Sequence, residues 1–245
     1  MNKKSKIIFV SLAGVGGCSI SKALRSLGQN GYPFDWLIAR QDFVISAIES
    51  NGGNFFEFDN PQRLHGRTII TTSNNDALSI HDFKNDWLME KDDVKKKYNR
   101  RWIRLNSILN SSEQSKLPQK IIFIRSFLDL DEPIESIYDN IFLRREENIK
   151  LWEEFLCRLK DKYPNTEMDL IIITSRKDLK SNLPNVRVIT MENYKDHKEI
   201  KKVIKGFVPL ANRWMFLFVN LKFMLKKLYL NILIKFSSKL KAQNI

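Results

Sequence analysis

Five short segments rich in apolar or β-branched residues predict the strands of this chain. Residues 6–11, 120–125 and 169–174 are apolar without alternation, which is typical of strands that are covered on both faces. Residues 68–72 and 186–190 are shorter segments of a similar kind. Because strands covered on both faces occur mainly in parallel sheets, the pattern predicts a buried, mostly parallel sheet.

Amphipathic segments separate several of these predicted strands. Their apolar residues recur at three- and four-residue spacing, which predicts α-helices, and parallel strands need crossover connections of this kind. We therefore expect an α/β fold, a layered, mostly parallel sheet with helices on both faces. This domain would span residues 1–206, followed by a basic helical tail in residues 207–245. The helical segments are 19–27, 92–109, 143–162 and 194–204.

The predicted tail differs from the rest of the chain in its charge. The 245 residues carry a formal net charge of +13, and residues 207–245 contribute +7 of it with no Asp or Glu. The apolar run at 214–219 is interrupted from Lys222 onward, well short of the roughly 20 residues that a spanning helix needs. Lysine stems and aromatic residues on a helix without acidic residues suit an anionic membrane surface. Packing on the body of the protein or on a partner subunit is the alternative.

Composition narrows the functional classes. An apolar share of 43% is typical of a folded globular chain, and two cysteines provide neither a disulfide framework nor a cysteine-based zinc site. We expect no metal and no cofactor. The low cysteine content suits a reducing compartment, and the short apolar run after the basic N-terminus fits a buried strand better than a signal peptide, so we expect a cytoplasmic protein. No helix-turn-helix, zinc or RNA-binding signature accompanies the charge, and no nucleic-acid partner is expected.

The sharpest chemical signal is Cys18, which follows the glycines of the first strand-to-helix turn. Unpaired amides and the helix dipole at such a position lower the pKa of a thiol, and the amides near Gly16 and Gly17 could bind an oxyanion. A small buried cysteine that packs the turn is the structural alternative. Cys157 fits the apolar pattern of a helix and needs no chemical role.

A cysteine nucleophile needs a base, and the chain contains three histidines. His65 and His197 lie in polar surroundings and are most simply solvated. His81 lies between apolar residues and next to Asp82, which makes it the candidate base. The group that orients its imidazole could be Asp82, Asp35, Asp59 or a backbone carbonyl.

Other polar residues could bind a substrate. Asp35 lies among aromatic residues in 32–37, which would make it a partly desolvated carboxylate. Arg100 and Arg101 begin a basic patch that could bind phosphate or carboxylate, although a solvated helix face is the simpler reading. Arg125 ends a predicted strand, where it could face a donor phosphate.

Several of these residues occur in an order that resembles a bacterial family of unknown function described as "putative papain-like cysteine peptidase". The resemblance covers residues 7–126 well and the remainder loosely. It implies a cysteine nucleophile at Cys18 and a histidine base at His81. Members are similar to proteins of surface polysaccharide assembly, which implies an alternative role there. The resemblance is carried by Ser11-Leu12, Cys18, Leu24-Arg25, Tyr32-Pro33-Phe34-Asp35-Trp36-Leu37, His81-Asp82-Phe83, Lys97 to Arg101 and Ile122 to Arg125.

Three functional hypotheses follow. The first is a cysteine peptidase or acyl-transfer hydrolase with a peptide, ester or glycan-precursor substrate. The second is a glycosyltransferase-like enzyme of surface polysaccharide biosynthesis, docked peripherally at the inner membrane surface by residues 207–245. Apolar parallel strands place phosphate sites at their carboxyl ends as readily as a protease cleft. The third is a non-catalytic accessory protein that binds a membrane complex through that tail.

Overall fold

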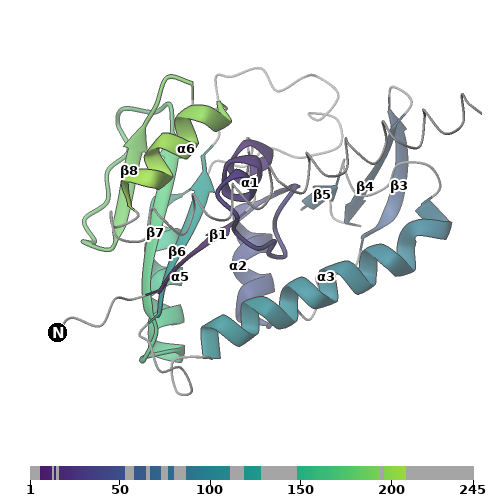
Figure 1. Cartoon of the computed structure of the whole chain (residues 1–245), viewed down its shortest axis with the longest axis horizontal. Coiled ribbons are helices and arrows are strands. Elements are labelled where there is room, and N and C mark those ends of the chain that lie inside the picture. Colours follow the sequence, from purple (N-terminus) through teal and green to yellow (C-terminus); the bar gives the residue numbers. More distant parts are fainter. Residues whose placement is uncertain are drawn as a thin grey trace, which may run out of the picture.

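The computed structural model of the chain contains two four-stranded sheets and the helices that surround them (Figure 1). Most of the predicted tail, residues 208–245, lies outside the described residues. None of the helices in the described part is both long and apolar enough to cross a membrane. The structure describes residues 6–12, 14, 17–52, 58–64, 67–72, 77–79, 87–110, 119–127, 148–193 and 196–207.

The first sheet is parallel, with strand order β1-β6-β7-β8. Three of its strands, β1, β6 and β7, are apolar along most of their length, and the residues in the middle of these strands are buried. This confirms the α/β fold class and the parallel sheet that the sequence predicts. The strands are β1 (Lys6–Ser11), β6 (Gln119–Ser126), β7 (Glu167–Thr174) and β8 (Val186–Thr190).

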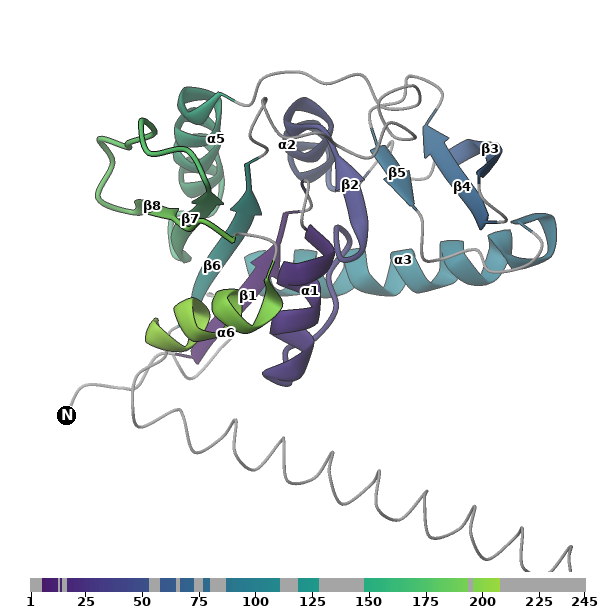
Figure 2. The ribbon, with the colours of Figure 1, turned by 90° about the horizontal axis from the view of Figure 1, so that it is seen from above.

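Helices cover both faces of the parallel sheet, as Figure 2 shows. Successive residues of a strand point to opposite faces, so Phe9 packs with α1 and α6 while Val10 packs on the side of α2, α3 and α5. α1 and α6 therefore cover one face of the sheet, and α2, α3 and α5 lie on the other. The helices are α1 (Gly17–Ser26), α2 (Gln41–Glu49), α3 (Trp87–Asn110), α5 (Ile149–Lys162) and α6 (His197–Gly206).

The second sheet is antiparallel and has the order β2-β5-β4-β3. The sequence predicts only one of its strands, at 68–72. β2 and β5 have three residues each, too few to show a period, and β3 contains Pro61, which its edge position tolerates. The strands are β2 (Leu37–Ala39), β3 (Phe58–Leu64), β4 (Arg67–Thr72) and β5 (Ala77–Ser79).

Helix α3 extends from the parallel sheet to the antiparallel one (Figures 1 and 2). Its buried residues Tyr98, Trp102, Leu105 and Leu109 belong to the same apolar cluster as residues of both sheets. The Trp102 ring meets Phe34 edge to face, with ring centroids 5.5 Å apart. The aromatic loop at 32–37 is therefore packed between α1 and α3.

Candidate active site

Cys18 lies in the first turn of α1, directly after the loop that leaves β1. Its side chain is partly exposed. The first-turn amides of a helix have no acceptor within the helix, and no acidic residue in the first turn of α1 offsets the positive end of the helix dipole. The position can therefore stabilise a thiolate and an oxyanion next to it.

Leu12 and Gly14, which follow β1, lie close to the end of β6. The amide of Leu12 donates to the carbonyl of Ile124 at 2.8 Å, which extends the β1–β6 ladder by one residue. Gly14 follows with φ +104°, and a Cβ atom there would lie 2.5 Å from the carbonyl oxygen of Ser126. Only glycine meets both conditions. The loop thus places the start of α1 at the carboxyl ends of β1 and β6, where ligands bind in open α/β sheets.

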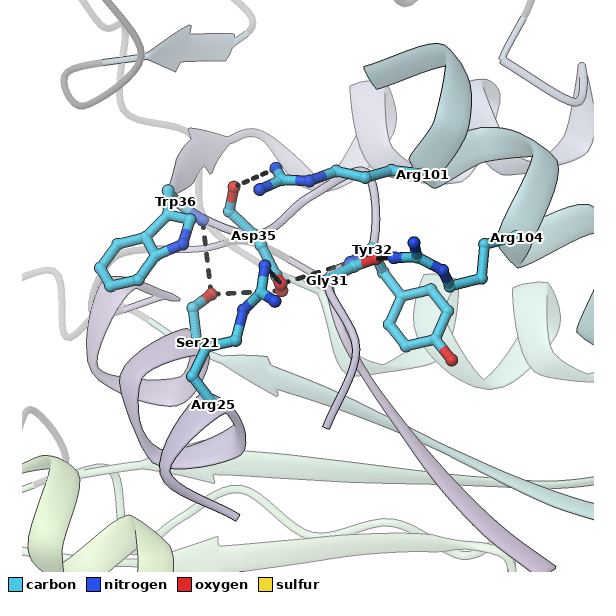
Figure 3. A network of polar contacts seen from close by, with 8 residues as sticks. All are labelled: Ser21, Arg25, Gly31, Tyr32, Asp35, Trp36, Arg101 and Arg104. Carbon is cyan, nitrogen blue, oxygen red and sulfur yellow. Dashed lines mark hydrogen bonds and ion pairs between the residues drawn. The ribbon is translucent and has the colours of Figure 1, made fainter. Parts of the chain in front are cut away.

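Helix α1 has an apolar face and a polar face. Ile20, Ala23, Leu24 and Leu27 are buried against the parallel sheet and α6. Cys18, Ser21 and Arg25 follow a three- and four-residue spacing, so they share a different face of the helix. Two of these three residues contact Asp35 (Figure 3), so this face is turned toward the loop at 32–36.

Asp35 joins α1 to the aromatic loop. Ser21 Oγ donates to Asp35 Oδ1 at 3.3 Å, and the amide of Tyr32 donates to Asp35 Oδ2 at 3.2 Å. Ser21 Oγ also accepts from the amide of Trp36 at 3.3 Å. Trp36 has φ +70°, a strained conformation for a bulky residue that costs about 1–2 kcal/mol. These hydrogen bonds hold the strained turn against the helix that carries Cys18.

Burial controls the protonation of Asp35. Its side chain is 2% exposed, and desolvation raises the pKa of the carboxyl group above 3.8 although Arg25, Arg101, the Tyr32 amide and Ser21 oppose the rise. Arg25 Nη2 lies 3.5 Å from Asp35 Oδ2, but Arg25 itself is 39% exposed, which weakens the pair. Burial also raises the pKa of Tyr32 to about 12.

The arginines predicted to bind substrate lie in different environments. Arg100 is exposed on α3. Arg101 is 8% exposed, donates from Nη1 to the carbonyl of Asp35 at 3.3 Å and lies 5.1 Å from the centre of the Tyr98 ring. Arg125 is 1% exposed, and its described hydrogen bonds go to backbone carbonyls. Arg101 is thus joined to the loop that contacts the Cys18 helix.

Three predicted site residues lie outside the part of the chain that the structure describes. They are Gly16, His81 and Asp82, whereas Gly17 opens α1. The pairing of Cys18 with His81 therefore stays a prediction. Among the described residues, no three His, Cys, Asp or Glu side chains are grouped so as to hold a metal ion.

Cys157 occupies a different part of the molecule. It is exposed on α5, which covers the face of the parallel sheet opposite α1, and it borders an open hollow of about 610 Å³. The two cysteines, both thiols, therefore belong to opposite faces of one sheet.

Ser21 and Arg104 are residues of this region that the sequence analysis did not single out. Ser21 follows Cys18 by three residues and Arg104 follows Arg101 by three, so helical spacing alone would have placed each beside a candidate already chosen. Arg104 Nη1 donates to the carbonyl of Gly31, which leads into the aromatic loop.

The fold and the position of Cys18 define an α/β protein with a thiol at the strand-to-helix turn of its first β-α unit. The family described as "Putative papain-like cysteine peptidase (DUF1796)" matches residues 7–176, and the chain belongs to that family. The matched range includes Cys18, Asp35 and His81. Searches of curated proteins and of solved structures give no significant match.

Proposed function

We propose that the protein is a cysteine hydrolase of the acyl-transfer type, with Cys18 as nucleophile and His81 as general base. The observation that carries the proposal is the place of Cys18, partly exposed in the first turn of α1 at the carboxyl ends of parallel strands. Membership of the family described as "Putative papain-like cysteine peptidase (DUF1796)" supports it.

The chemistry follows the general course of thiol acyl transfer. The Cys18 thiolate attacks the carbonyl carbon of a peptide or ester, and first-turn amides of α1 stabilise the oxyanion that forms. Protonated His81 gives its proton to the departing amine or alcohol, and a thioester remains on Cys18. His81 then takes a proton from water, the hydroxide attacks the thioester, and the acid and the thiol are released.

We propose Asp82 or a backbone carbonyl, rather than Asp35, as the group that orients His81. The oxygens of Asp35 accept hydrogen bonds from Ser21 and from the Tyr32 amide, and Arg25 lies beside them. In this proposal Asp35 is a positioning residue: it holds the polar face of α1, and with it Cys18, against the loop at 32–36.

The test is turnover of a panel of peptide and ester substrates, with mass spectrometry of the intact protein to detect an acyl group on Cys18. Cys18→Ala and His81→Ala should each reduce turnover at least about a thousandfold, because the nucleophile and its base act as a unit. Cys157→Ala is the matched control and should keep full turnover. Turnover that survives in Cys18→Ala would refute the proposed nucleophile.

A further inference from the structure

We propose that Arg25, Arg101 and Arg104 form a binding site for a phosphoryl group. The three side chains come from α1 and α3 and meet at residues 31–35 (Figure 3). Arg25 pairs with the side chain of Asp35 while Arg101 donates to its carbonyl oxygen.

Arg25 and Arg104 also meet at Gly31. The Arg25 guanidinium lies so close to Gly31 that a Cβ there would collide with Nη2 and lie 2.8 Å from Cζ. Arg104 donates to the carbonyl oxygen of the same residue. A single short loop thus holds all three guanidinium groups, which is a convergent arrangement rather than a scattered basic surface.

The cluster carries more positive charge than the described residues neutralise. In the described part of the chain, three guanidinium groups gather at residues 31–35, and Asp35 supplies the one carboxylate paired with them, so an excess of two positive charges remains even when Asp35 is ionised. Repulsion by Arg101 and Arg104 adds to desolvation in lowering the pKa of Arg25. Like charges held this close are destabilising unless an anion joins them.

The cluster also has more hydrogen-bond donors than described acceptors. Each guanidinium carries five N–H groups. Within the described part of the chain, Arg101 and Arg104 each donate one hydrogen bond, and Arg25 makes only the 3.5 Å ion pair. Most of the fork-shaped donor pairs that bind phosphate oxygens therefore have no acceptor among the described residues.

Burial increases from Arg25 to Arg101. Arg25 is 39% exposed, Arg104 is partly buried and Arg101 is 8% exposed. An anion can therefore enter beside Arg25 and meet a partly desolvated charge farther in, where the interaction is stronger than in water. The excess of two charges matches a phosphate dianion better than a monocarboxylate.

The site lies on the same face of α1 as Cys18. Arg25 follows Cys18 by seven residues, which is two helical turns or about 10 Å along the axis. A phosphoryl group bound there would approach the thiol side of the helix without touching the sulfur. Binding is thus independent of the reaction proposed for Cys18.

The test is isothermal titration of the full-length protein with inorganic phosphate at low ionic strength. We expect one phosphate per chain, at least tenfold weaker binding in Arg25→Gln and Arg104→Gln, and binding within twofold of the wild type in Lys96→Gln. Lys96 is 71% exposed on α3, so this control removes one positive charge outside the cluster. Arg25→Lys keeps the charge but loses the fork, and it should weaken binding several-fold.

Two further titrations extend the test. Cys18→Ala should bind phosphate like the wild type, so the site and the proposed nucleophile can fail separately. Phenyl phosphate that binds as tightly as inorganic phosphate indicates a phosphoryl group on a larger molecule, and binding at least tenfold weaker indicates free phosphate. Absence of saturable binding in the wild type, or an equal loss in Lys96→Gln, would overturn the proposal.

Discussion

Arg125 and the cluster of Arg25, Arg101 and Arg104 differ in the partners that their guanidinium groups find in the protein. Arg125 donates to the carbonyls of Leu12 and Ala39 at 2.7 and 2.8 Å and lies 5.3 Å from the centre of the Trp152 ring. It joins the end of β1 to β2 and so links the two sheets. In the Arg25, Arg101 and Arg104 cluster, Arg25 pairs with the Asp35 carboxylate, and the other two arginines each donate one described hydrogen bond to a carbonyl oxygen of the loop, Arg101 to Asp35 and Arg104 to Gly31. Arg125 therefore links parts of the fold, whereas we propose that the guanidinium groups of the cluster bind a ligand.

The largest loss of stability is expected when Arg125 is substituted. Arg125→Met removes two charge-assisted hydrogen bonds and leaves two buried carbonyls without that donor, so the free energy of unfolding should fall by about 3–5 kcal/mol. Arg104→Met, with one partly buried hydrogen bond, should lose about 1 kcal/mol. Urea unfolding measures both. Equal losses would remove the distinction between the two regions.

A substitution at Gly14, between β1 and α1, should cause the next largest loss of stability. Gly14→Ala introduces a side chain at φ +104° and a clash with the Ser126 carbonyl, so stability should fall by about 2–4 kcal/mol. Gly206→Ala is the matched control, because a Cβ there meets nothing within 4 Å. A Gly14→Ala protein as stable as Gly206→Ala in urea would show that Gly14 does not approach β6 as described.

Asp35 gives a pH-dependent effect. Its pKa is raised in the folded protein, so its protonated form adds stability that is complete below about pH 4 and is lost as the pH rises through the raised pKa. The difference in unfolding free energy between wild type and Asp35→Asn should therefore shift against the wild type by up to about 1.4 kcal/mol per pH unit in this window. Urea unfolding from pH 3 upward measures it. A difference that grows in favour of the wild type would mean that the arginines, rather than desolvation, set the pKa.

The smallest stability effect is expected at Gly31. Its Cβ would displace the mobile end of Arg25 rather than backbone, so Gly31→Ala should cost at most about 0.5 kcal/mol. Phosphate binding should nevertheless weaken several-fold, because the guanidinium leaves the cluster. Calorimetry with phosphate, next to urea unfolding of the same variant, separates the two effects. Unchanged phosphate affinity would place Arg25 outside the site.

The parallel sheet could be predicted from the sequence because its strands are long and uniformly apolar. β1 and β8 begin and end where the pattern predicts. The antiparallel sheet could not, since β2 and β5 are too short for a periodic signal. Helix α2 was also missed, as its N-cap residue Arg40 is not a usual capping type.

The part of the candidate site that depends on local sequence could also be predicted. The spacing of glycines before Cys18 marks a strand-to-helix turn, and this is a local feature. Ser21 contacts Trp36, and Arg104 contacts Gly31, through interactions between distant segments, which local patterns do not encode. The sequence suggests a substrate role for Arg125 because its position at the end of a strand is a local feature. Its burial and its carbonyl partners depend on distant segments and cannot be read from the sequence.

The reactivity of Cys18 is the central claim, and the pH dependence of alkylation measures it most directly. Cys157→Ala leaves Cys18 as the single thiol, and Cys18→Ala leaves Cys157 as the reference. The position at the start of α1 predicts that iodoacetamide modifies Cys18 with an apparent pKa below the ordinary thiol value of about 8.5, and faster than Cys157 at pH 6. An apparent pKa of 8.5 or higher, with Cys18 no faster than Cys157, would contradict the account.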